Sequence, residues 1–425
     1  MRLLKIGVYY PGYLKQFYEQ RPSLASQSYA IQHAALIDDC FGSSNFWTTA
    51  LSDHGYETCD IVANAEPLQK MWASEQGLAL DQPSWLFDIT EAQVKAFRPD
   101  VLLVADYSTV TAGFLRRLRD ICPSIRLVLV WCGAPFQDGS IFSECDIVLS
   151  CVPELVVRFQ ENGHRSRHIN HAFHSLVLGK IDLQAPPNTD FAFMGSIIKA
   201  DQFHIGRERL LSKLVRETEL QIWSDACQDP SHDQQRSIPS GVGVEDSTPG
   251  VAGFRASCAR AISALPLLSP LAHRASRFIF GGSNYSQSPA LSVEHCVKLR
   301  SNPPVFGLQM FQQLRDSRVA LNTHIDISPI NASNMRLFEA TGVGACLLTD
   351  WKANLSKLFE LDSEVVAYRN ADECVEKVKY LLEHESERRS IAAAGQRRTL
   401  REHTFDHRVA QIDAIIHEAM AHKIQ

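Results

Sequence analysis

The sequence predicts an α/β protein built from two doubly wound domains. The chain has 425 residues, which is too long for one ordinary hydrophobic core. Short apolar strands alternate with helical segments across the first 172 residues, a pattern typical of parallel sheets. A second alternation begins at Phe191, after a stretch from His174 to Asp190 that contains Pro and Asn and reads as a linker. We expect domains at 1–175 and 190–405, with a final helical segment at 406–425 that crosses back to the first domain.

The first domain is expected to contain six strands separated by helices. Its first strand should end at a turn, Pro11-Gly12-Tyr13, which would expose polar residues at the carboxyl edge of the sheet. Pro153 starts one helix and Gly163 stops it. The predicted strands are Leu3–Tyr10, Tyr56–Ala63, Val101–Ala105, Arg126–Trp131, Asp146–Cys151 and His168–Ala172. The predicted helices are Ser28–His54 with a break near Gly42, Ala92–Phe97, Thr111–Cys122 and Pro153–Asn162.

The second domain shows the same alternation around a less regular middle. Its predicted strands are Phe191–Met194, Leu220–Trp223, Val319–Leu321, Cys346–Leu348 and Val365–Tyr368. Its predicted helices are Arg207–Glu217, Gly307–Leu314, Ala371–Leu382, Glu385–His403 and His407–Ala421, and the sequence assigns no element type to Leu355–Phe359. The segment Asp229–Gly253 is rich in Ser, Pro and Gly and predicts a mobile loop, and Arg255–Arg300 predicts helical pieces without a clear topology.

Composition excludes several classes of protein. Hydrophobic residues make up 45% and charged residues 21%, and the apolar N-terminal stretch is short and broken by Gly and Pro, so we expect no membrane span and no signal peptide. The net charge of −6 argues against a nucleic-acid partner. The eleven cysteines form no CxxC pair and no cluster with His at metal spacing, which predicts reduced thiols, a cytoplasmic location and no bound metal or cofactor.

The stretch Leu321–Asp350 carries the densest set of polar residues. A strand, a polar loop, a short helix, a glycine turn and a second strand make a βαβ unit. Ligands bind to open α/β sheets at the carboxyl ends of the strands, where this polar loop lies. Arg336 and Glu339 share one face of the helix, where Arg can neutralise a diphosphate and Glu can bind a ribose diol. An ordinary buried ion pair is the alternative interpretation.

Several motifs resemble one family of enzymes. The segments WCGAPFQDGSIFSECDIVLSC, HAFH, FMGSI, FGLQMFQQLRDSRVALN and NMRLFEATGVGACLLTDW are similar to the CgeB-like group of GT-B glycosyltransferases. The tail YLLEHESERRSIAAAGQRRTLREHTFDHR also looks like this family, and the resemblance covers roughly residues 98–408 apart from 227–296. It implies the GT-B fold, in which two Rossmann-like domains face each other across a cleft and a C-terminal helix packs back.

The resemblance also implies a set of donor-binding residues. Glu339 matches the family glutamate that holds the ribose of a nucleotide sugar, and Asn334 and Arg336 match the polar positions before it. The remaining candidates are Gly195 and Ser196 for phosphate, Arg207 for phosphate, Trp223 for the nucleobase, and Thr341 and Gly342 after the glutamate. A core-filling role is at least as good an interpretation of Trp223. Related retaining enzymes carry a second glutamate eight positions before the first, and here that position is Asn331.

Candidates for catalysis come from both domains. His324, at the rim of the polar loop, is the first choice for a sugar or phosphate contact, against a structural histidine. Asp138 and His171 are candidates for an acceptor-side base, against a helix cap and a satisfied core residue. Tyr10 and Gly12, at the first turn of the chain, are candidates for lining the acceptor site.

The expected function is metal-independent transfer of a sugar from a nucleoside diphosphate donor to a glycan or small-molecule acceptor. The chain is expected to act without a cofactor, and a homodimer is possible on this reading. The alternatives are a nucleotide-sugar epimerase of the same architecture, which would need no acceptor, and a non-catalytic sugar- or protein-binding relative, for which Asn331 is the main support. The absence of GxGxxG after the first strand argues against a nicotinamide dehydrogenase.

Overall fold

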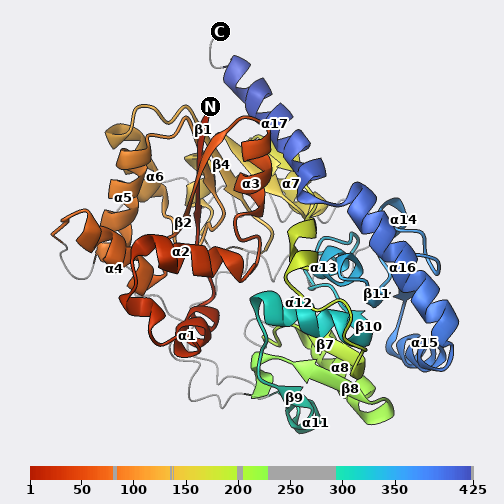
Figure 1. The fold of residues 1–425 in the computed structure, drawn as a ribbon. Coiled ribbons are helices and arrows are strands. Elements are labelled where there is room, and N and C mark those ends of the chain that lie inside the picture. The colour runs from red at the N-terminus through yellow and green to blue at the C-terminus, as the bar shows by residue number, and fades with distance from the viewer. Residues whose placement is uncertain (80–83, 135, 137, 199–203, 228–292, 423–425) are drawn as a thin grey trace.

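The computed structural model describes residues 1–79, 84–134, 136, 138–198, 204–227 and 293–422. Within these residues the chain forms two six-stranded parallel sheets, each covered by helices, and the predicted α/β class with two doubly wound halves is confirmed. Figure 1 shows the N-terminal sheet at the upper left and the C-terminal sheet at the lower right. The segments predicted as a mobile loop at 229–253 and as helical pieces at 255–292 lie outside the described residues.

The N-terminal sheet has the strand order β2-β1-β3-β4-β5-β6. All its pairings are parallel, and its central strands are buried on both faces, which explains their continuous apolar sequences. The strands are β1 (Arg2–Gly7), β2 (Glu57–Val62), β3 (Val101–Val104), β4 (Leu127–Trp131), β5 (Ile147–Ser150) and β6 (Ser166–His168). The helices are α1 (Pro11–Glu19), α2 (Tyr29–Asp38), α3 (Phe46–Asp53), α4 (Glu66–Glu75), α5 (Trp85–Phe97), α6 (Ala112–Ile121) and α7 (Pro153–Glu161).

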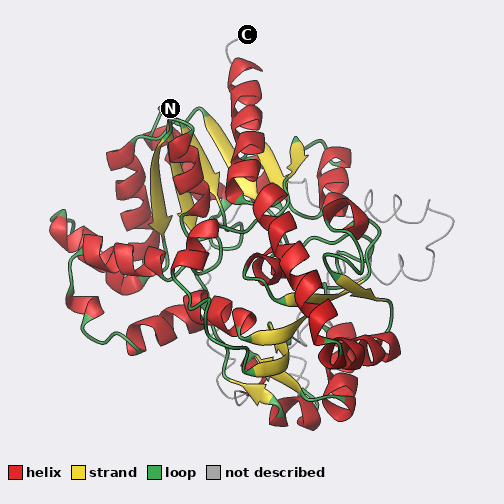
Figure 2. Cartoon of the chain, turned by 45° about the vertical axis from the view of Figure 1, so that its right-hand side comes forward, coloured by secondary structure: helices red, strands yellow, loops and turns green. Residues whose placement is uncertain are grey.

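The C-terminal sheet has the order β12-β11-β10-β7-β8-β9, so β7 and β10 lie at its centre. The strands are β7 (Thr189–Met194), β8 (Leu220–Trp223), β9 (Ser301–Asn302), β10 (Ser317–Asn322), β11 (Cys346–Asp350) and β12 (Val366–Tyr368). The helices are α8 (Ile205–Glu217), α11 (His295–Leu299), α12 (Gly307–Arg315), α13 (Arg336–Gly342), α14 (Leu355–Leu358), α15 (Ala371–Glu383), α16 (Glu385–Glu402) and α17 (Phe405–His422). Figure 2 shows the strands of both sheets enclosed by helices.

Two predictions about the first domain were wrong. Pro11 does not form a turn after the first strand but begins α1, because its fixed φ suits the first helical position. The last strand is not His168–Ala172 but β6, which pairs with β5 through Ser166–His168. The chain leaves the sheet after His168 because Phe173 pairs instead with the segment around Thr404, which returns from the second domain.

The chain therefore crosses between the domains twice, and the two crossings lie side by side. The backbone N–H of Phe173 donates to the carbonyl of His403 at 2.9 Å, and the N–H of Phe405 donates to the carbonyl of Phe173 at 3.1 Å. One hydrophobic cluster runs through this junction and includes core residues of both sheets. The two domains are thus joined at one place by paired backbone.

The predicted C-terminal helix packs back onto the N-terminal domain, as expected. The side chains of α17 predicted to share an apolar face, Val409, Ile412, Ile416 and Met420, are all buried. α17 packs against α3, and the Tyr56 hydroxyl donates to Asp413 at 2.7 Å. Figure 1 shows α17 leaving the C-terminal domain and running along the N-terminal one.

Candidate functional site

The carboxyl ends of β7, β10, β11 and β12 meet at one edge of the C-terminal sheet. Successive side chains along a strand point to opposite faces of the sheet, so the polar residues that follow these strands lie on either one face or the other. Thr323, Asp350 and Tyr368 follow the face covered by α8 and α15, where they line a surface hollow of about 290 Å³. Asn322 and α13 belong to the other face. The candidate donor residues are therefore divided between two sides of the same edge.

Glu339 and Arg336 form an ion pair on α13. Arg336 Nη1 lies 2.8 Å from Glu339 Oε2, and Arg336 Nη2 donates to the carbonyl of Met194 at the end of β7. Glu339 is 6% exposed. Burial raises the pKa of Glu339, although the charge of Arg336 lowers it. This pair brings a cation and a carboxylate to the end of the central strand of the sheet.

Tyr10 of the N-terminal domain stands close to this pair. Its side chain is 65% exposed and precedes α1, with Gly12 exposed in the first turn of that helix. The protein surrounding the phenol raises the pKa of Tyr10, the charge of Glu339 raises it further, and the charge of Arg336 lowers it. The predicted acceptor-side Tyr10 and the predicted donor-side Glu339 are thus brought together across the domain interface.

His324 is buried beneath the polar loop. Its Nδ1 lies 2.6 Å from Asp350 Oδ1, and its backbone N–H donates to the same oxygen at 3.0 Å. Its Nε2 is buried and has no partner among the described residues. Burial would raise the pKa of Asp350, but the charge and hydrogen bonds of His324, together with Lys352, lower it below its usual value. His324 thus anchors the start of the loop to Asp350, and its imidazole is fully buried.

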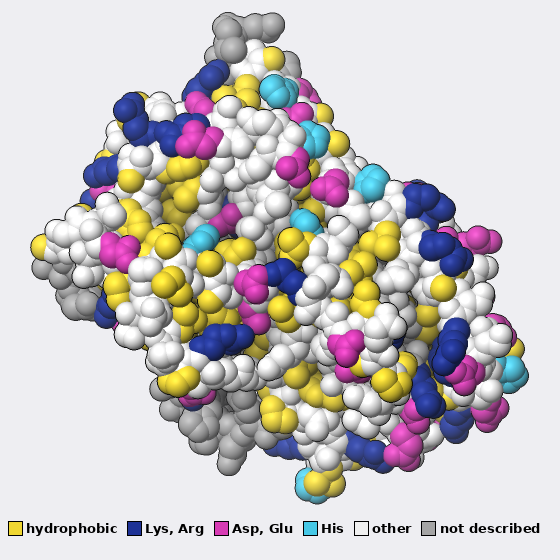
Figure 3. All heavy atoms as spheres, viewed as in Figure 1, with side chains coloured by type: hydrophobic (Ala, Val, Ile, Leu, Met, Phe, Trp, Pro, Cys, Tyr) yellow, Lys and Arg dark blue, Asp and Glu magenta, His cyan; other side chains and the backbone are white. Residues whose placement is uncertain are grey.

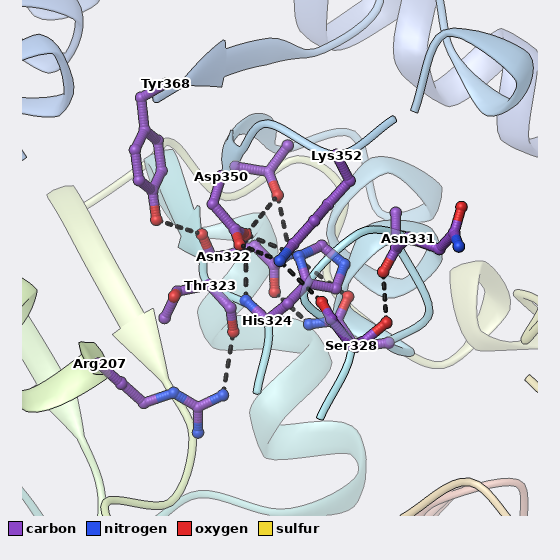
Figure 4. A network of polar contacts seen from close by, with 12 residues as sticks. Arg207, Asn322, Thr323, His324, Ser328, Asn331, Asp350, Lys352 and Tyr368 are labelled. Atoms are coloured by element: carbon purple, nitrogen blue, oxygen red, sulfur yellow. Dashed lines mark hydrogen bonds and ion pairs between the residues drawn. The ribbon is translucent and has the colours of Figure 1, made fainter. Parts of the chain in front are cut away.

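Lys352 ties the polar loop to Asp350. Its Nζ donates to the carbonyl of Ser328 at 2.8 Å and lies 3.4 Å from Asp350 Oδ2. The Ser328 hydroxyl in turn donates to the carbonyl of Asn331. Figure 4 shows these residues as one connected network, with the side-chain amide of Asn331 pointing away from the Asp350 end of it. The loop that precedes α13 is therefore fixed by buried polar contacts.

Arg207 braces the ends of β7 and β10. One guanidinium nitrogen donates to the carbonyl of Ser196 at 2.8 Å, and another donates to the carbonyl of Thr323 at 2.9 Å. Burial lowers the pKa of Arg207 to about 10, against the raising effect of Asp350. A β-carbon on Gly195 would lie 3.0 Å from the ring of Phe193, so a larger residue here would require the ring to shift. The Arg207 side chain thus links the Gly195–Ser196 turn to the end of β10.

The other donor candidates bond to or pack against neighbouring parts of the C-terminal domain or the domain junction. Asn334 exchanges amide hydrogen bonds with Asn322 at the end of β10. Thr341 is fully buried and bonds to Thr399 of α16, and Trp223 packs against the core. A β-carbon on Gly342 would lie 2.3 Å from the ring of Phe173. Thr341 and Gly342 therefore pack α13 against α16 and against Phe173.

The two candidate bases occupy structural positions. Asp138 is exposed and accepts hydrogen bonds from the backbone and hydroxyl of Ser140, where a short 3₁₀ turn (Ser140–Ser143) begins. The ring of His171 lies 5.3 Å from that of Trp131. Burial, and then the charge of Arg408, lower the pKa of His171 to about 3. Such an imidazole is a weak base at neutral pH, and Asp138 holds a turn.

Sequence reasoning missed Asp350, Lys352 and Glu154. Asp350 ends the apolar strand CLLTD, so the rule that selected His324 after β10 would have selected it as well. Glu154 gave no such signal because it lies on α7 of the other domain. Its carboxylate nevertheless accepts a hydrogen bond from the backbone N–H of Asn331 at 3.2 Å.

Neither a metal cluster nor a membrane-spanning helix is found among the residues that the structure describes. Within them, no group of three or more His, Cys, Asp or Glu side chains is arranged to hold a metal ion. Across the same part of the chain, no helix has the length and apolar character needed to cross a membrane. On the face seen in Figure 3, acidic and basic side chains are interspersed.

Comparison with known proteins agrees with this architecture. Residues 260–414 match the family model described as glycosyl transferase-like. The fold is similar to that of sucrose-phosphate synthase from Thermosynechococcus elongatus, with a TM-score of 0.52, 10% identity and 99% coverage of both chains. It is also similar to a glycosyltransferase from Rickettsia africae ESF-5, with a TM-score of 0.50, 8% identity, and coverage of 99% of this chain and 98% of that one.

A third similar structure is HepE from Anabaena, with a TM-score of 0.50, 11% identity, and coverage of 98% of this chain and 100% of that chain. Among curated proteins, none matches this sequence. The identities are low, so these likenesses concern the fold. The chain therefore has the GT-B fold, and its residues 260–414 are similar to a glycosyl transferase-like family.

Proposed function

We propose that this protein is a glycosyltransferase that moves a sugar from a nucleoside diphosphate donor to an acceptor bound mainly by the N-terminal domain. The observation that carries the proposal is the Glu339–Arg336 ion pair, which lies in the glycosyl transferase-like region and whose charges act on Tyr10 of the other domain. The carboxylate of Glu339 can accept two hydrogen bonds from a ribose diol, and Arg336 supplies positive charge beside it. We also propose that the chain belongs to the CgeB-like group and acts in the cytoplasm.

The proposed chemistry depends on stabilising the leaving nucleoside diphosphate. Arg336, whose guanidinium reaches the end of β7, and the Gly195–Ser196 turn beside Arg207 would receive its negative charge, without requiring a metal ion. The loop before α13 is fixed by Lys352 and Asp350, so little reorganisation is needed when the donor binds. Tyr10 would contact the acceptor or the transferred sugar, since it stands on the opposite side of the interface.

A nucleotide-binding screen tests this proposal. UDP, GDP, dTDP, ADP and CMP would each be added to the wild type and to Glu339→Gln, and the thermal midpoint of unfolding would be measured. UDP is the first choice because HepE, one of the similar structures, is described in complex with UDP-glucose. A ligand present at about 100 times its Kd stabilises the native state by about 2.7 kcal/mol, which gives a readable shift.

The control for this screen is Glu376→Gln, an exposed glutamate on α15 of the same domain. One nucleotide should stabilise the wild type and the control, and Glu339→Gln should lose that stabilisation. If no nucleotide stabilises the folded wild type, the proposal fails, and a non-catalytic role becomes the better interpretation. Turnover of a nucleotide sugar without any acceptor would instead indicate an epimerase. Transfer that persists in EDTA would support a metal-independent reaction.

A further inference from the structure

Glu154 and Asn331 connect the two domains at the loop that precedes α13. Glu154 is the second residue of α7 in the N-terminal domain, and Asn331 lies in the loop between β10 and α13 of the C-terminal domain. Oε1 of Glu154 accepts the backbone N–H of Asn331 at 3.2 Å. Oε2 of the same carboxylate is buried and has no partner among the described residues. One oxygen is therefore used by the protein, and the other is left free.

A buried carboxylate oxygen without a hydrogen bond is unfavourable, and nearly all such atoms in proteins have a partner. A position in the first turn of α7 explains why a glutamate is tolerated there, because negative charge is favourable at a helix N-terminus. It does not explain why the carboxylate reaches into the other domain or why Oε2 is shielded from water. A hydrogen-bond donor from a ligand would satisfy that oxygen.

The surroundings of Asn331 indicate what the ligand is. The loop is rigidly held, since Ser328 bonds to the carbonyl of Asn331 and Lys352 bonds to the carbonyl of Ser328. Asn331 stands eight residues before Glu339, where related retaining enzymes carry a glutamate, and here the side chain is a neutral amide. A carboxylate from the opposite domain, that of Glu154, instead bonds to the backbone of this position.

We propose that Glu154 is a sugar-binding residue whose Oε2 accepts a hydrogen bond from a hydroxyl of the donor sugar. This inference rests on the proposed function, and it assigns one contact within that site. The contact exists only when α7 faces the loop of the C-terminal domain as it does here. Binding of the sugar thus depends on both domains, whereas binding of the nucleotide depends on the C-terminal domain alone.

The test compares a nucleotide with its sugar derivative. The dissociation constants of UDP and UDP-glucose, or of whichever nucleotide the screen selects and its glucose derivative, would be measured by calorimetry. The proteins are the wild type, Glu154→Gln, Glu154→Asp and Glu161→Gln, where Glu161 is an exposed control at the far end of α7. Circular dichroism and the thermal midpoint of unfolding would establish that each variant is folded.

The dissociation constants of all four proteins for the nucleotide should agree within about twofold. Glu154→Gln should bind the sugar derivative about tenfold more weakly than the wild type, because a charged hydrogen-bond acceptor is lost. Glu154→Asp keeps the charge at the helix start but withdraws the carboxylate by one methylene. It should remain as stable as the wild type yet lose the same sugar-dependent affinity.

Two results would overturn the inference in different ways. If the wild type prefers the sugar derivative and both Glu154 variants keep that preference, the assignment of Glu154 is wrong while the donor site stands. If the folded wild type binds neither form of any nucleotide, the proposed function fails and the inference fails with it.

Discussion

The carboxylate of Asp350 holds two buried cationic or polar groups at once, with His324 Nδ1 at 2.6 Å from Oδ1 and Lys352 Nζ at 3.4 Å from Oδ2. Through these contacts the last residue of β11 fixes the loop that follows β10. The loop carries no secondary structure of its own between Thr323 and Asn334. One acidic side chain from the neighbouring strand therefore supplies two of the contacts that fix its shape.

We predict that Asp350→Asn destabilises the protein by about 3 kcal/mol, because it leaves the buried partners of the carboxylate without their counter-charge. The folded-state pKa of Asp350 is below its unfolded value, so the difference from wild type should be present at neutral pH and should shrink as pH falls below about 4. Urea unfolding at several pH values measures it. Asp190→Asn, at an exposed ion pair, is the matched control and should change stability by less than about 1 kcal/mol. Equal effects of the two substitutions would contradict the assignment.

Tyr10→Phe should leave the fold intact and reduce sugar transfer. Because the side chain is 65% exposed, the free energy of unfolding should change by less than about 0.5 kcal/mol. Loss of one hydroxyl contact should lower kcat/KM by about three- to tenfold. The control is Tyr380→Phe, an exposed tyrosine on α15 that bonds to Glu387. A wild-type kcat/KM in Tyr10→Phe would remove this residue from the acceptor site.

Two glycines in helices should respond in opposite ways to alanine. Gly342→Ala places a methyl group 2.3 Å from the ring of Phe173 and should destabilise the protein by about 1–3 kcal/mol. Gly113→Ala in α6 meets nothing within 4 Å and should be neutral or stabilising by about 0.5 kcal/mol. The measurement is the free energy of unfolding in urea. If Gly342→Ala were as stable as Gly113→Ala, the close packing of α13 on Phe173 would be wrong.

Buried neutral histidines should make the protein sensitive to mild acid. His403 accepts a hydrogen bond from Arg408 and lies 2.9 Å from the carbonyl of Leu358, and burial first, then neighbouring charge, lower its pKa to about 4. The unfolded chain takes up this proton below about pH 6.5, so stability present above that pH is lost as pH falls toward 4.

His403 alone should contribute a slope of at most about 1.4 kcal/mol per pH unit. The slope is obtained from urea unfolding between pH 7 and pH 5. His403→Gln should flatten it, whereas the exposed His417→Gln should leave it unchanged. An unchanged slope in His403→Gln would show that other groups take up the protons.

The fold was predictable because parallel strands have a strong signature. Apolar segments such as Arg126–Trp131 and Cys346–Leu348 match β4 and β11 closely, since strands buried on both faces must be apolar throughout. α1 was not predicted, because Pro11 and Gly12 read equally well as a turn and only tertiary packing of Tyr13 and Phe17 decides for a helix.

The site was only partly predictable, because its parts come from distant segments. The local spacing of Arg336 and Glu339 places them together without knowledge of the fold. The meeting of Glu154 with Asn331, 177 positions later, depends on how the domains face each other, which no local pattern encodes. Thr341 was selected for its proximity in sequence, but two residues along a helix turn a side chain by about 200°, toward α16.

The paired crossing at Phe173 and Thr404 has a mechanical consequence. Two chain segments hydrogen-bonded to each other bend as one ribbon, so the domains share a single pivot rather than two independent tethers. Rotation about this pivot would change the separation of Glu154 and Asn331 while leaving both sheets unchanged. α17 packs against α3 of the N-terminal domain. A cut between α16 and α17 would therefore leave one covalent connection between the domains instead of two. The relative orientation of the domains would then be less restricted.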